Sequence, residues 1–466
     1  MIGAFGSDPR RRALAVCLTS AFMTGLDVSI VNVALPSIRE ALHAGDDALQ
    51  WTVSGYALAF GLFLIPAGRL GDARSRRTIF LWGVTLFTLS SAFCGLAWQM
   101  PVLIVSRLVQ GMAAGLLNPQ VSGLIQQMFR GSERGRAFGA LGATIGVSTA
   151  AGPLIGGALV TVFGSELGWR WVFLVNVPIG LALLPLAWRV LPRPGVDERR
   201  RESMDPVGVL LLGVGVAGLL VPAIQRHRWD AQVTALIAVS ALVVLAAFVA
   251  WERRYPREPL VNLELFRKRS YRLGTAIALF YFSGFTGIFF IFTLYLQSGH
   301  GYSPLLAGLA ITPFALGSAS AAVLGGHLVS RMGRRLTAIG LCMVIAGLIA
   351  TMVATALVPG PRTGLATALP LLLAGLGSGL VISPNQAITL SEVPPAGGGS
   401  AAGVLQTGQR LGSAVGIAAA GSTFFGSLGG GWASAFRHGL IVVVSSVGIA
   451  LLAALYDLMR SRRDAH

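Results

Sequence analysis

The chain has 466 residues, of which 54% are hydrophobic and only 12% charged, and its mean hydropathy is +0.71. A soluble domain carries about 25% charged residues, so this composition excludes an ordinary water-soluble protein and indicates one that lies largely in lipid. The formal net charge of +17 would suit a nucleic-acid-binding protein, but the positions of the basic residues, given below, exclude that class.

Fourteen apolar segments follow one another along the chain, each near the length of about 20 residues that a helix needs to cross the bilayer core. We therefore expect an all-α integral membrane protein with 14 transmembrane helices. Asn118-Pro119 and Pro384-Asn385 interrupt the fourth and twelfth segments. The approximate ranges are 13–36, 50–68, 78–98, 102–127, 137–163, 170–188, 206–224, 231–251, 273–297, 304–329, 337–357, 364–390, 400–425 and 436–457.

The distribution of basic residues orients these spans. With a cytoplasmic N-terminus, the inward-facing segments hold 28 of the 36 basic residues, as the positive-inside rule requires. Both termini are therefore predicted to be cytoplasmic. Basic loops that face anionic lipid also account for the net charge, so no nucleic-acid partner is needed.

Two long polar stretches, 189–205 and 252–272, divide the spans into groups of six, two and six. We predict an N-terminal six-helix bundle over 1–190, cytoplasmic linkers with two inserted helices over 191–272, and a C-terminal six-helix bundle over 273–466. An internal repeat supports this division. GRLGDARSRR (68–77) follows span two and GHLVSRMGRR (326–335) follows span ten, which is the shift that two inserted spans predict.

The repeat indicates two inverted-repeat halves, as in transporters that bind substrate between their halves near the membrane midplane. The two copies differ at one position, because Ser330 stands where the first copy has Asp72. We therefore expect the charge network of this loop to differ between the halves.

Five motifs occur in order on the predicted spans: LDVSIVNVALP (26–36), GRLGDARSRR (68–77), RLVQGMAAG (107–115), GPLIGG (152–157) and WRWVFLVNVPIG (169–180). Together they resemble the fourteen-span drug/proton antiporters of the major facilitator superfamily, the multidrug efflux type. The resemblance covers nearly the whole chain. It implies a monomeric transporter that exchanges protons for small amphipathic substrates.

Asp27 is the only acidic residue between Ala13 and Pro36, although a charge inside the bilayer is costly. At 1.5 Å per residue, Asp27 lies about 12 Å and Arg107 about 8 Å from the outer ends of their spans. Burial disfavours the charged carboxylate and Arg107 favours it, so a small movement between them would switch proton binding. We predict that the two couple protons to transport, and the resemblance assigns proton transfer to the arginine. A static salt bridge and direct substrate contact are the alternatives.

The loop after span two resembles the family's cytoplasmic gate. The resemblance implies that Gly68, Asp72, Arg76 and Arg77 form a charge network that holds one conformational state. The alternative for the two arginines is that they only anchor the loop on the positive-inside face.

Span five carries small residues every three or four positions, which allow another helix to approach closely. The resemblance identifies an antiporter motif at Gly142, Gly146, Gly152, Pro153, Gly156 and Gly157. Ser148 departs from the family, which usually has glycine there, and a plain packing face is the alternative reading. Pro153 removes a backbone donor and is expected to kink the helix.

Polar and aromatic residues inside the spans are candidates for a substrate cavity. Arg410 either lines that cavity or bonds backbone carbonyls at the interrupted twelfth span. The aromatic residues of span nine are the less favoured candidates, because phenylalanine in a span usually contacts lipid. The predicted cavity residues are Asn32, Tyr56, Gln110, Asn118, Gln406, Gln409 and Arg410.

Motifs of enzymes are absent from the sequence. No P-loop lysine occurs, and Cys17, Cys94 and Cys342 have neither metal-ligand spacing nor an evident disulfide partner. We predict no cofactor and no metal. The expected function is proton-coupled export of drugs, dyes or secreted metabolites across the cytoplasmic membrane of a bacterium. The alternatives are a proton-independent facilitator or importer of a small nutrient, and a membrane scaffold or sensor that transports nothing.

Overall fold

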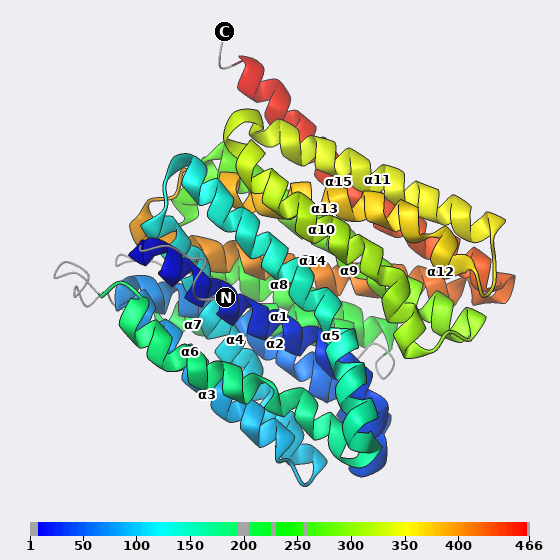
Figure 1. Ribbon diagram of the computed structural model, residues 1–466. Helices are drawn as coiled ribbons and strands as arrows, with labels where there is room; N and C mark the ends of the chain where they lie inside the picture. The colour runs from blue at the N-terminus through cyan, green and yellow to red at the C-terminus, as the bar shows by residue number, and fades with distance from the viewer. Residues whose placement is uncertain (1–7, 194–204, 225–229, 255–259, 464–466) are drawn as a thin grey trace. The chain divides into compact units, whose positions relative to one another are not determined.

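The computed structural model describes residues 8–193, 205–224, 230–254 and 260–463, and throughout these ranges the regular structure is helical, with no strand (Figure 1). Side-chain caps begin several helices. The Asp8 carboxylate accepts the Arg10 N–H ahead of the first helix, and the Ser75 hydroxyl accepts the Thr78 N–H ahead of the third. Such caps satisfy amides that have no partner within a helix.

The six helices of the N-terminal part are α1 (Pro9–Ala41), α2 (Asp46–Ala73), α3 (Arg76–Gly95), α4 (Met100–Met128), α5 (Gly131–Leu174) and α6 (Asn176–Val190). α5 contains a break at Gly164, whose φ of 77° lies in the left-handed region. Glycine adopts that conformation without a steric penalty, so the chain turns there. This break separates the predicted fifth and sixth spans.

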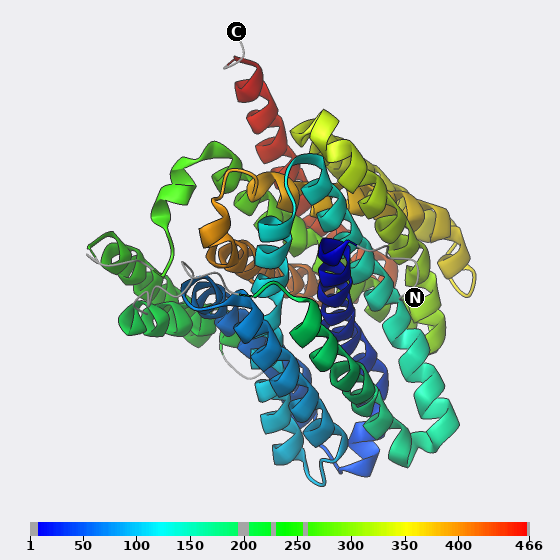
Figure 2. The ribbon, with the colours of Figure 1, turned by 60° about the vertical axis from the view of Figure 1, so that its left-hand side comes forward.

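The middle of the chain forms α7 (Pro206–Ile224), α8 (Ala231–Arg254) and the short helix η3 (Leu263–Arg267). α7 and α8 pack against each other, and α7 lies beside α2. In Figure 2 this α7–α8 pair is the dark green pair at the left.

The remaining elements are α9 (Arg269–Leu294), η4 (Tyr295–Gly299), α10 (Pro304–Met332), α11 (Arg334–Leu357), α12 (Thr363–Ala366), α13 (Ala368–Thr389), η5 (Pro395–Gly397), α14 (Gly398–Gly426), η6 (Leu428–Gly430) and α15 (Trp432–Arg463). α13 packs against both α10 and α11, and α11 also packs against α15 (Figure 1). Glycines allow the close approach of α11 and α13, because a Cβ on Gly340 would stand 2.7 Å from the Gly377 carbonyl oxygen.

A helix occupies each of the fourteen predicted spans. Among the described residues, twelve helices are long and apolar enough to cross a membrane. The two that fall short are α7, of which Pro206–Leu219 counts as a shorter apolar helix, and α14, in which Gln406, Gln409 and Arg410 lower the hydropathy. The chain is thus an all-helical protein with about twelve candidate spans.

The helices pack into two compact units. The first unit comprises Met1–Phe129, Ala151–Glu264 and Val393–Thr407, and the second comprises Arg130–Ala150, Leu265–Glu392 and Gly408–His466. Two helices, α5 and α14, are therefore shared between the units, because different parts of each pack with different neighbours. Each unit has its own apolar core, built around Trp169 and Phe173 in the first and around Tyr281 and Phe292 in the second.

Candidate functional site

The carboxylate of Asp27 lies fully buried in the first unit, against α4. Nη1 of Arg107 donates a hydrogen bond to Oδ2 of Asp27 at 2.6 Å, and Arg107 is only 1% exposed. A buried ion pair is costly to desolvate and remains favourable only when further hydrogen bonds satisfy both ions. The other partners of these two side chains therefore decide whether the pair is stable.

Two amides complete the surroundings of Asp27. Oδ1 accepts Nε2 of Gln110 at 2.9 Å and Nδ2 of Asn176 at 3.0 Å. Both amides also donate to Oγ of Ser91, at 3.0 and 3.1 Å, and Ser91 donates to the Phe173 carbonyl oxygen at 2.9 Å. Asp27 thus accepts three side-chain hydrogen bonds from α4 and α6, and α3 supports two of the donors.

Arg107 is held from its other side by α2. Its Nε donates to the Thr52 carbonyl oxygen at 3.0 Å, and its Nη1 also donates to Oε1 of Gln110 at 2.8 Å. The guanidinium carbon lies 4.1 Å from the centre of the Tyr56 ring, within the range of a cation–π interaction. Arg107 therefore retains several partners that do not depend on the charge of Asp27.

Small residues bring these helices close enough for such short contacts. A Cβ built on Gly111 would clash with the backbone of Tyr56, so only glycine allows α4 and α2 to cross there. Gly152 and Gly156 of α5 pack against Ser29 and Ile30 of α1, next to Asp27. The glycines of RLVQGMAAG and GPLIGG thus contribute to the site through packing.

We name Asp27, Arg107, Gln110, Asn176, Ser91 and Tyr56 the Asp27 network. In its present state both charges are compensated within the first unit. All three side-chain contacts of the Asp27 carboxylate are hydrogen bonds that it accepts, from Arg107, Gln110 and Asn176.

The sequence reasoning missed three residues that bind Asp27 or its donors. Asn176 is the only amide residue in the motif WRWVFLVNVPIG, and this isolation among apolar residues could have identified it. Ser91 belongs to the polar pair Ser90-Ser91 in the third span. Thr52 could not have been found from its side chain, because it contributes through its carbonyl oxygen.

A second charged cluster lies at the end of α2. Oδ1 of Asp72 accepts Nη2 of Arg76 at 2.7 Å and the Gly399 N–H at 3.0 Å, while Oδ2 accepts the Ser400 N–H at 2.7 Å and its hydroxyl at 2.9 Å. Gly399 and Ser400 begin α14, and free amides at a helix N-terminus favour a carboxylate. Arg76 also donates to the carbonyl oxygens of Gly123, Pro395 and Ala396.

The two other predicted gate residues occupy different surroundings. Gly68 lies against α14, where a Cβ would clash with the Gly399 carbonyl oxygen. Arg77 is directed away from Asp72, since it donates to the Trp188 carbonyl oxygen and its guanidinium carbon lies 4.8 Å from the centre of the Trp188 ring. Asp72, Arg76 and Gly68 therefore share one cluster, and Arg77 binds α6.

The residues of the predicted antiporter motif divide between two neighbours. A Cβ on Gly142 or Gly146 would stand 3.2 Å from the side chains of Ala322 and Ala319 of α10 in the second unit. Gly152 and Gly156 face α1 in the first unit, Pro153 lies inside α5, and Gly157 has no neighbour within 4 Å. The motif thus supplies close-packing positions to two different helices.

The predicted cavity residues are similarly dispersed. Gln110 and Tyr56 belong to the Asp27 network. Asn32 is exposed and, like Asn118, donates to a carbonyl oxygen of its own helix, at 3.5 and 3.0 Å. Gln406 donates to Oγ of Ser122 at 3.2 Å in the first unit. Gln409 and Arg410, both half-buried, belong to the second unit.

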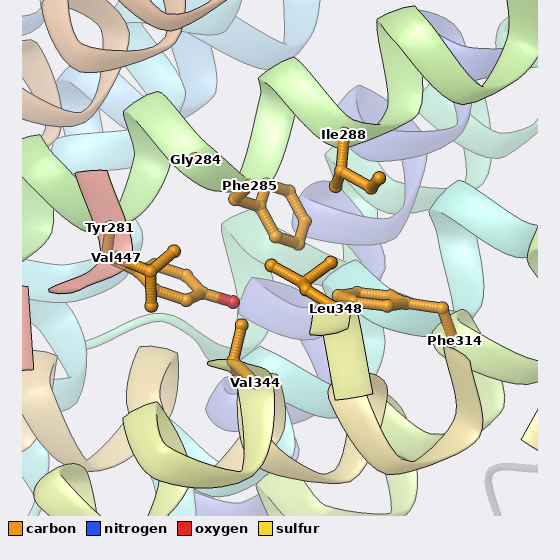
Figure 3. Close-up of a pocket in the computed structure, with 8 residues that line it drawn as sticks. All are labelled: Tyr281, Gly284, Phe285, Ile288, Phe314, Val344, Leu348 and Val447. Atoms are coloured by element: carbon orange, nitrogen blue, oxygen red, sulfur yellow. The ribbon is translucent and has the colours of Figure 1, made fainter. Parts of the chain in front are cut away.

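The aromatic residues of α9 line a small cavity in the second unit (Figure 3). Its walls are apolar except for the hydroxyl of Tyr281, which donates to Oγ of Ser378 at 2.7 Å. The cavity measures about 10 Å³, no more than one water molecule occupies. It is too small for a drug-sized ligand. The lining residues are Tyr281, Gly284, Phe285, Ile288, Phe314, Val344, Leu348 and Val447.

The second unit contains a charged cluster of its own. Nε of Arg334 donates to Oδ2 of Asp457 at 2.8 Å, and Nε of Arg269 lies 3.0 Å from Oδ1. Arg334 also donates to Oδ1 of Asn385 at 2.5 Å and to the Ser270 carbonyl oxygen at 3.1 Å. Across the described ranges, no group of three His, Cys, Asp or Glu residues is placed to hold a metal ion.

Comparison with known proteins places the chain among transporters. The family model of the Major Facilitator Superfamily matches residues 17–417. The probable actinorhodin transporter of Streptomyces coelicolor is 37% identical over 437 residues, covering 91% of this chain and 75% of the relative. The multidrug resistance protein Stp of Mycobacterium tuberculosis is 35% identical, covering 86% of this chain and 73% of the relative. The crystal structure of the human organic anion transporter MFSD10 (TETRAN) superposes with a TM-score of 0.71 at 15% identity, covering 96% of this chain and 100% of that one.

Proposed function

The chain belongs to the Major Facilitator Superfamily, and we propose that it exports amphipathic organic compounds from a bacterial cell in exchange for protons. Members of this family are transporters and not enzymes, and they move small molecules, typically as monomers. The names of the two bacterial relatives, one a probable actinorhodin transporter and one a multidrug resistance protein, support drugs, dyes or secreted metabolites as the cargo.

Coupling to protons is proposed on one observation, the full burial of the Asp27 carboxylate, which accepts hydrogen bonds from Arg107, Gln110 and Asn176. When a proton binds Asp27, the ion pair with Arg107 is lost. Arg107 then depends on Gln110, the Thr52 carbonyl oxygen and the Tyr56 ring, and its position can change at a lower cost. Because Arg107 touches α2 and Asp27 lies on α1, a change in this pair alters the contact between two helices of the bundle.

The cluster of Asp72, Arg76 and the N-terminus of α14 is proposed to hold one conformational state during alternating access. Its carboxylate accepts two backbone amides and one hydroxyl of α14, so separating α14 from α2 would break three hydrogen bonds at once. Gly68 permits the close approach that these contacts need. Arg77, which binds Trp188, is proposed to fix α6 instead.

The proposed topology has fourteen spans with both termini in the cytoplasm, in the cytoplasmic membrane of a bacterium. In addition to the twelve helices that meet the length and hydropathy requirements, α7 and α14 would cross. α7 is uniformly apolar and pairs with α8, while Gln406 of α14 donates to Ser122 of α4. The division into bundles over 1–190 and 273–466, with α7 and α8 inserted between them, is retained as part of this proposal.

The test is uptake of ethidium and of actinorhodin into everted membrane vesicles with an imposed proton gradient. Wild-type protein is expected to accumulate at least one of the two compounds, and a protonophore is expected to abolish that accumulation. Asp27→Asn should lose gradient-driven uptake while still exchanging labelled for unlabelled substrate.

Asp457→Asn is the matched control, since it also removes a buried aspartate bonded to arginine, but in the second unit. The control should retain the gradient dependence at whatever expression level it reaches. Uptake that ignores the protonophore would favour a facilitator. Full gradient-driven uptake by Asp27→Asn would exclude Asp27 as the coupling residue.

A further inference from the structure

The inserted helices carry a buried acidic pair that the proposed transport cycle does not use. Asp205 precedes α7 and is 1% exposed, and Glu252, near the end of α8, is 5% exposed. Both belong to the first unit. Burial of two neighbouring carboxyl groups requires an explanation, because isolated buried charges are strongly disfavoured.

Asp205 is well supplied with hydrogen-bond donors. Its Oδ1 accepts the Gly208 N–H at 3.0 Å, which caps α7, and its Oδ2 accepts Nε1 of Trp251 at 2.9 Å. The N-terminus of α7 adds a favourable partial positive charge. Each carboxylate oxygen of Asp205 thus has a hydrogen-bond donor.

Glu252 is poorly supplied by comparison. Its Oε2 accepts the Val261 N–H at 3.5 Å, a long hydrogen bond, and the Leu260 backbone makes a weaker contribution. Its Oε1 is buried and has no hydrogen-bond partner among the described residues. A carboxylate oxygen in this position loses its hydration without compensation, whereas a protonated carboxyl group could use that oxygen as a donor.

The unpartnered oxygen and Oδ2 of Asp205 both lie beside Gly208. A Cβ built on Gly208 would stand 2.9 Å from Oε1 of Glu252 and closer still to Oδ2 of Asp205, so both oxygens border the space that this glycine leaves open. Two carboxyl groups that share a buried site do not both ionise readily, and the pair retains one proton. Since Asp205 has the donors, the proton belongs on Glu252.

Among the residues that the structure describes, few other charged groups lie near the pair. Arg69 of α2 is the described cation whose charge acts on Glu252. On α8 itself, Arg253 and Arg254 are exposed, as is Glu264 beyond the Val261 contact. Arg69 favours the ionised form of Glu252, and its influence depends on the packing of α7 beside α2.

We propose that Glu252 binds a proton and donates it in a hydrogen bond to Asp205, which makes the foot of the α7–α8 pair a second protonation site, separate from Asp27. With the proton bound, Asp205 and Glu252 join α7 to α8 and to the Leu260–Val261 segment. Without it, the two carboxylates repel each other. The contact is therefore stable at low pH and weakens as the pH rises through the range in which Glu252 releases its proton.

Infrared difference spectroscopy of the full-length protein in detergent tests this proposal directly, and it needs no transported substrate. Titration from acid to alkaline pH is expected to remove a carboxylic-acid C=O band. That band should be missing in Glu252→Gln and unchanged in Glu264→Gln, which removes an exposed carboxylate from the adjoining segment. It should also persist in Asp27→Asn, which separates this site from the proposed coupling residue.

Asp205→Asn supplies a second measurement that does not depend on the folding of Glu252→Gln. Removing the neighbouring negative charge should weaken proton binding by Glu252 about tenfold or more, seen as a shift of the band's titration midpoint to lower pH. A band that persists in Glu252→Gln, a midpoint unmoved by Asp205→Asn, or a Glu252 that stays ionised throughout the titration would each overturn the proposal.

Discussion

Arg76 and Arg334 occupy equivalent positions in the two copies of the repeated loop, yet they find their acids in different ways. Arg76 pairs with Asp72, four residues earlier in the same loop. In the second copy that position is Ser330, and Arg334 pairs instead with Asp457 of α15, 123 residues away. Both arginines lie at the first turn of the following helix, α3 or α11.

The difference shows that a repeated arginine can keep its buried place while the source of its counter-charge changes. The sequence predicts that the two loops differ, because Ser330 replaces the acid of the first copy. It does not predict that a distant residue, Asp457, supplies an acid to the second cluster. The first carboxylate serves one arginine and the N-terminus of α14. The second serves two arginines, Arg334 and Arg269. The two clusters should therefore respond differently to loss of the acid.

The largest effect is expected from Asp72→Asn. The change leaves Arg76 buried without a counter-charge. It also replaces one of the two acceptor oxygens that bind α14 with an NH2 group, which cannot accept a hydrogen bond. We therefore expect the free energy of unfolding to fall by about 3–5 kcal/mol. Unfolding by SDS in mixed micelles, followed by circular dichroism, measures it. Asp230→Asn, which alters an exposed acid, should stay within about 0.5 kcal/mol of wild type. Equal stability of the two variants would show that Asp72 is not a buried counter-ion.

Asp457→Asn should have a smaller effect. Arg334 keeps Asn385 and the Ser270 carbonyl oxygen as partners, and Arg269 is about a third exposed, so water can solvate it. A loss of about 2–3 kcal/mol is expected by the same measurement. A loss larger than that of Asp72→Asn would reverse the comparison and make the second cluster the more important one.

Moving the acid back into the loop tests how much its location matters. In the Asp457→Asn background, Ser330→Asp restores the spacing that Asp72 has from Arg76. Position 330 is exposed, so the new pair would be solvated, and it should recover no more than about 1 kcal/mol. Full recovery would indicate that the spacing alone determines the stability of the pair, whatever its burial.

The smallest effect is expected from Arg77→Gln. Arg77 lacks a carboxylate partner in the Asp72 cluster, and its contacts are the Trp188 ring and carbonyl oxygen. Loss of about 1 kcal/mol or less is expected. This loss of stability can be measured as a small shift in the thermal unfolding midpoint. Unfolding is followed by the reaction of the buried thiols of Cys17 and Cys94 with a fluorogenic dye. The Cys342→Ser background removes the exposed thiol, which would react in the folded protein. A shift as large as that of Asp72→Asn would place Arg77 in the same cluster.

The sequence alone identified the helices and the main charges of the site. Hydropathy locates spans because backbone amides must be satisfied internally within lipid, so long apolar segments become helices. The regular rise of a helix placed Asp27 and Arg107 at similar depths, and Gln110 follows Arg107 by one turn. These inferences depend on local geometry, which one chain segment determines by itself.

Tertiary packing decided the rest. Asn176, Ser91 and the Thr52 carbonyl oxygen join Asp27 and Arg107 only because α2, α3 and α6 lie beside them, and no spacing in the sequence reports that proximity. The same holds for Asp457 beside Arg334, and for Glu252 beside Asp205. A local pattern determines which residues can be buried, but the partner of a buried charge depends on which distant helix packs against it, and that is a property of the whole fold.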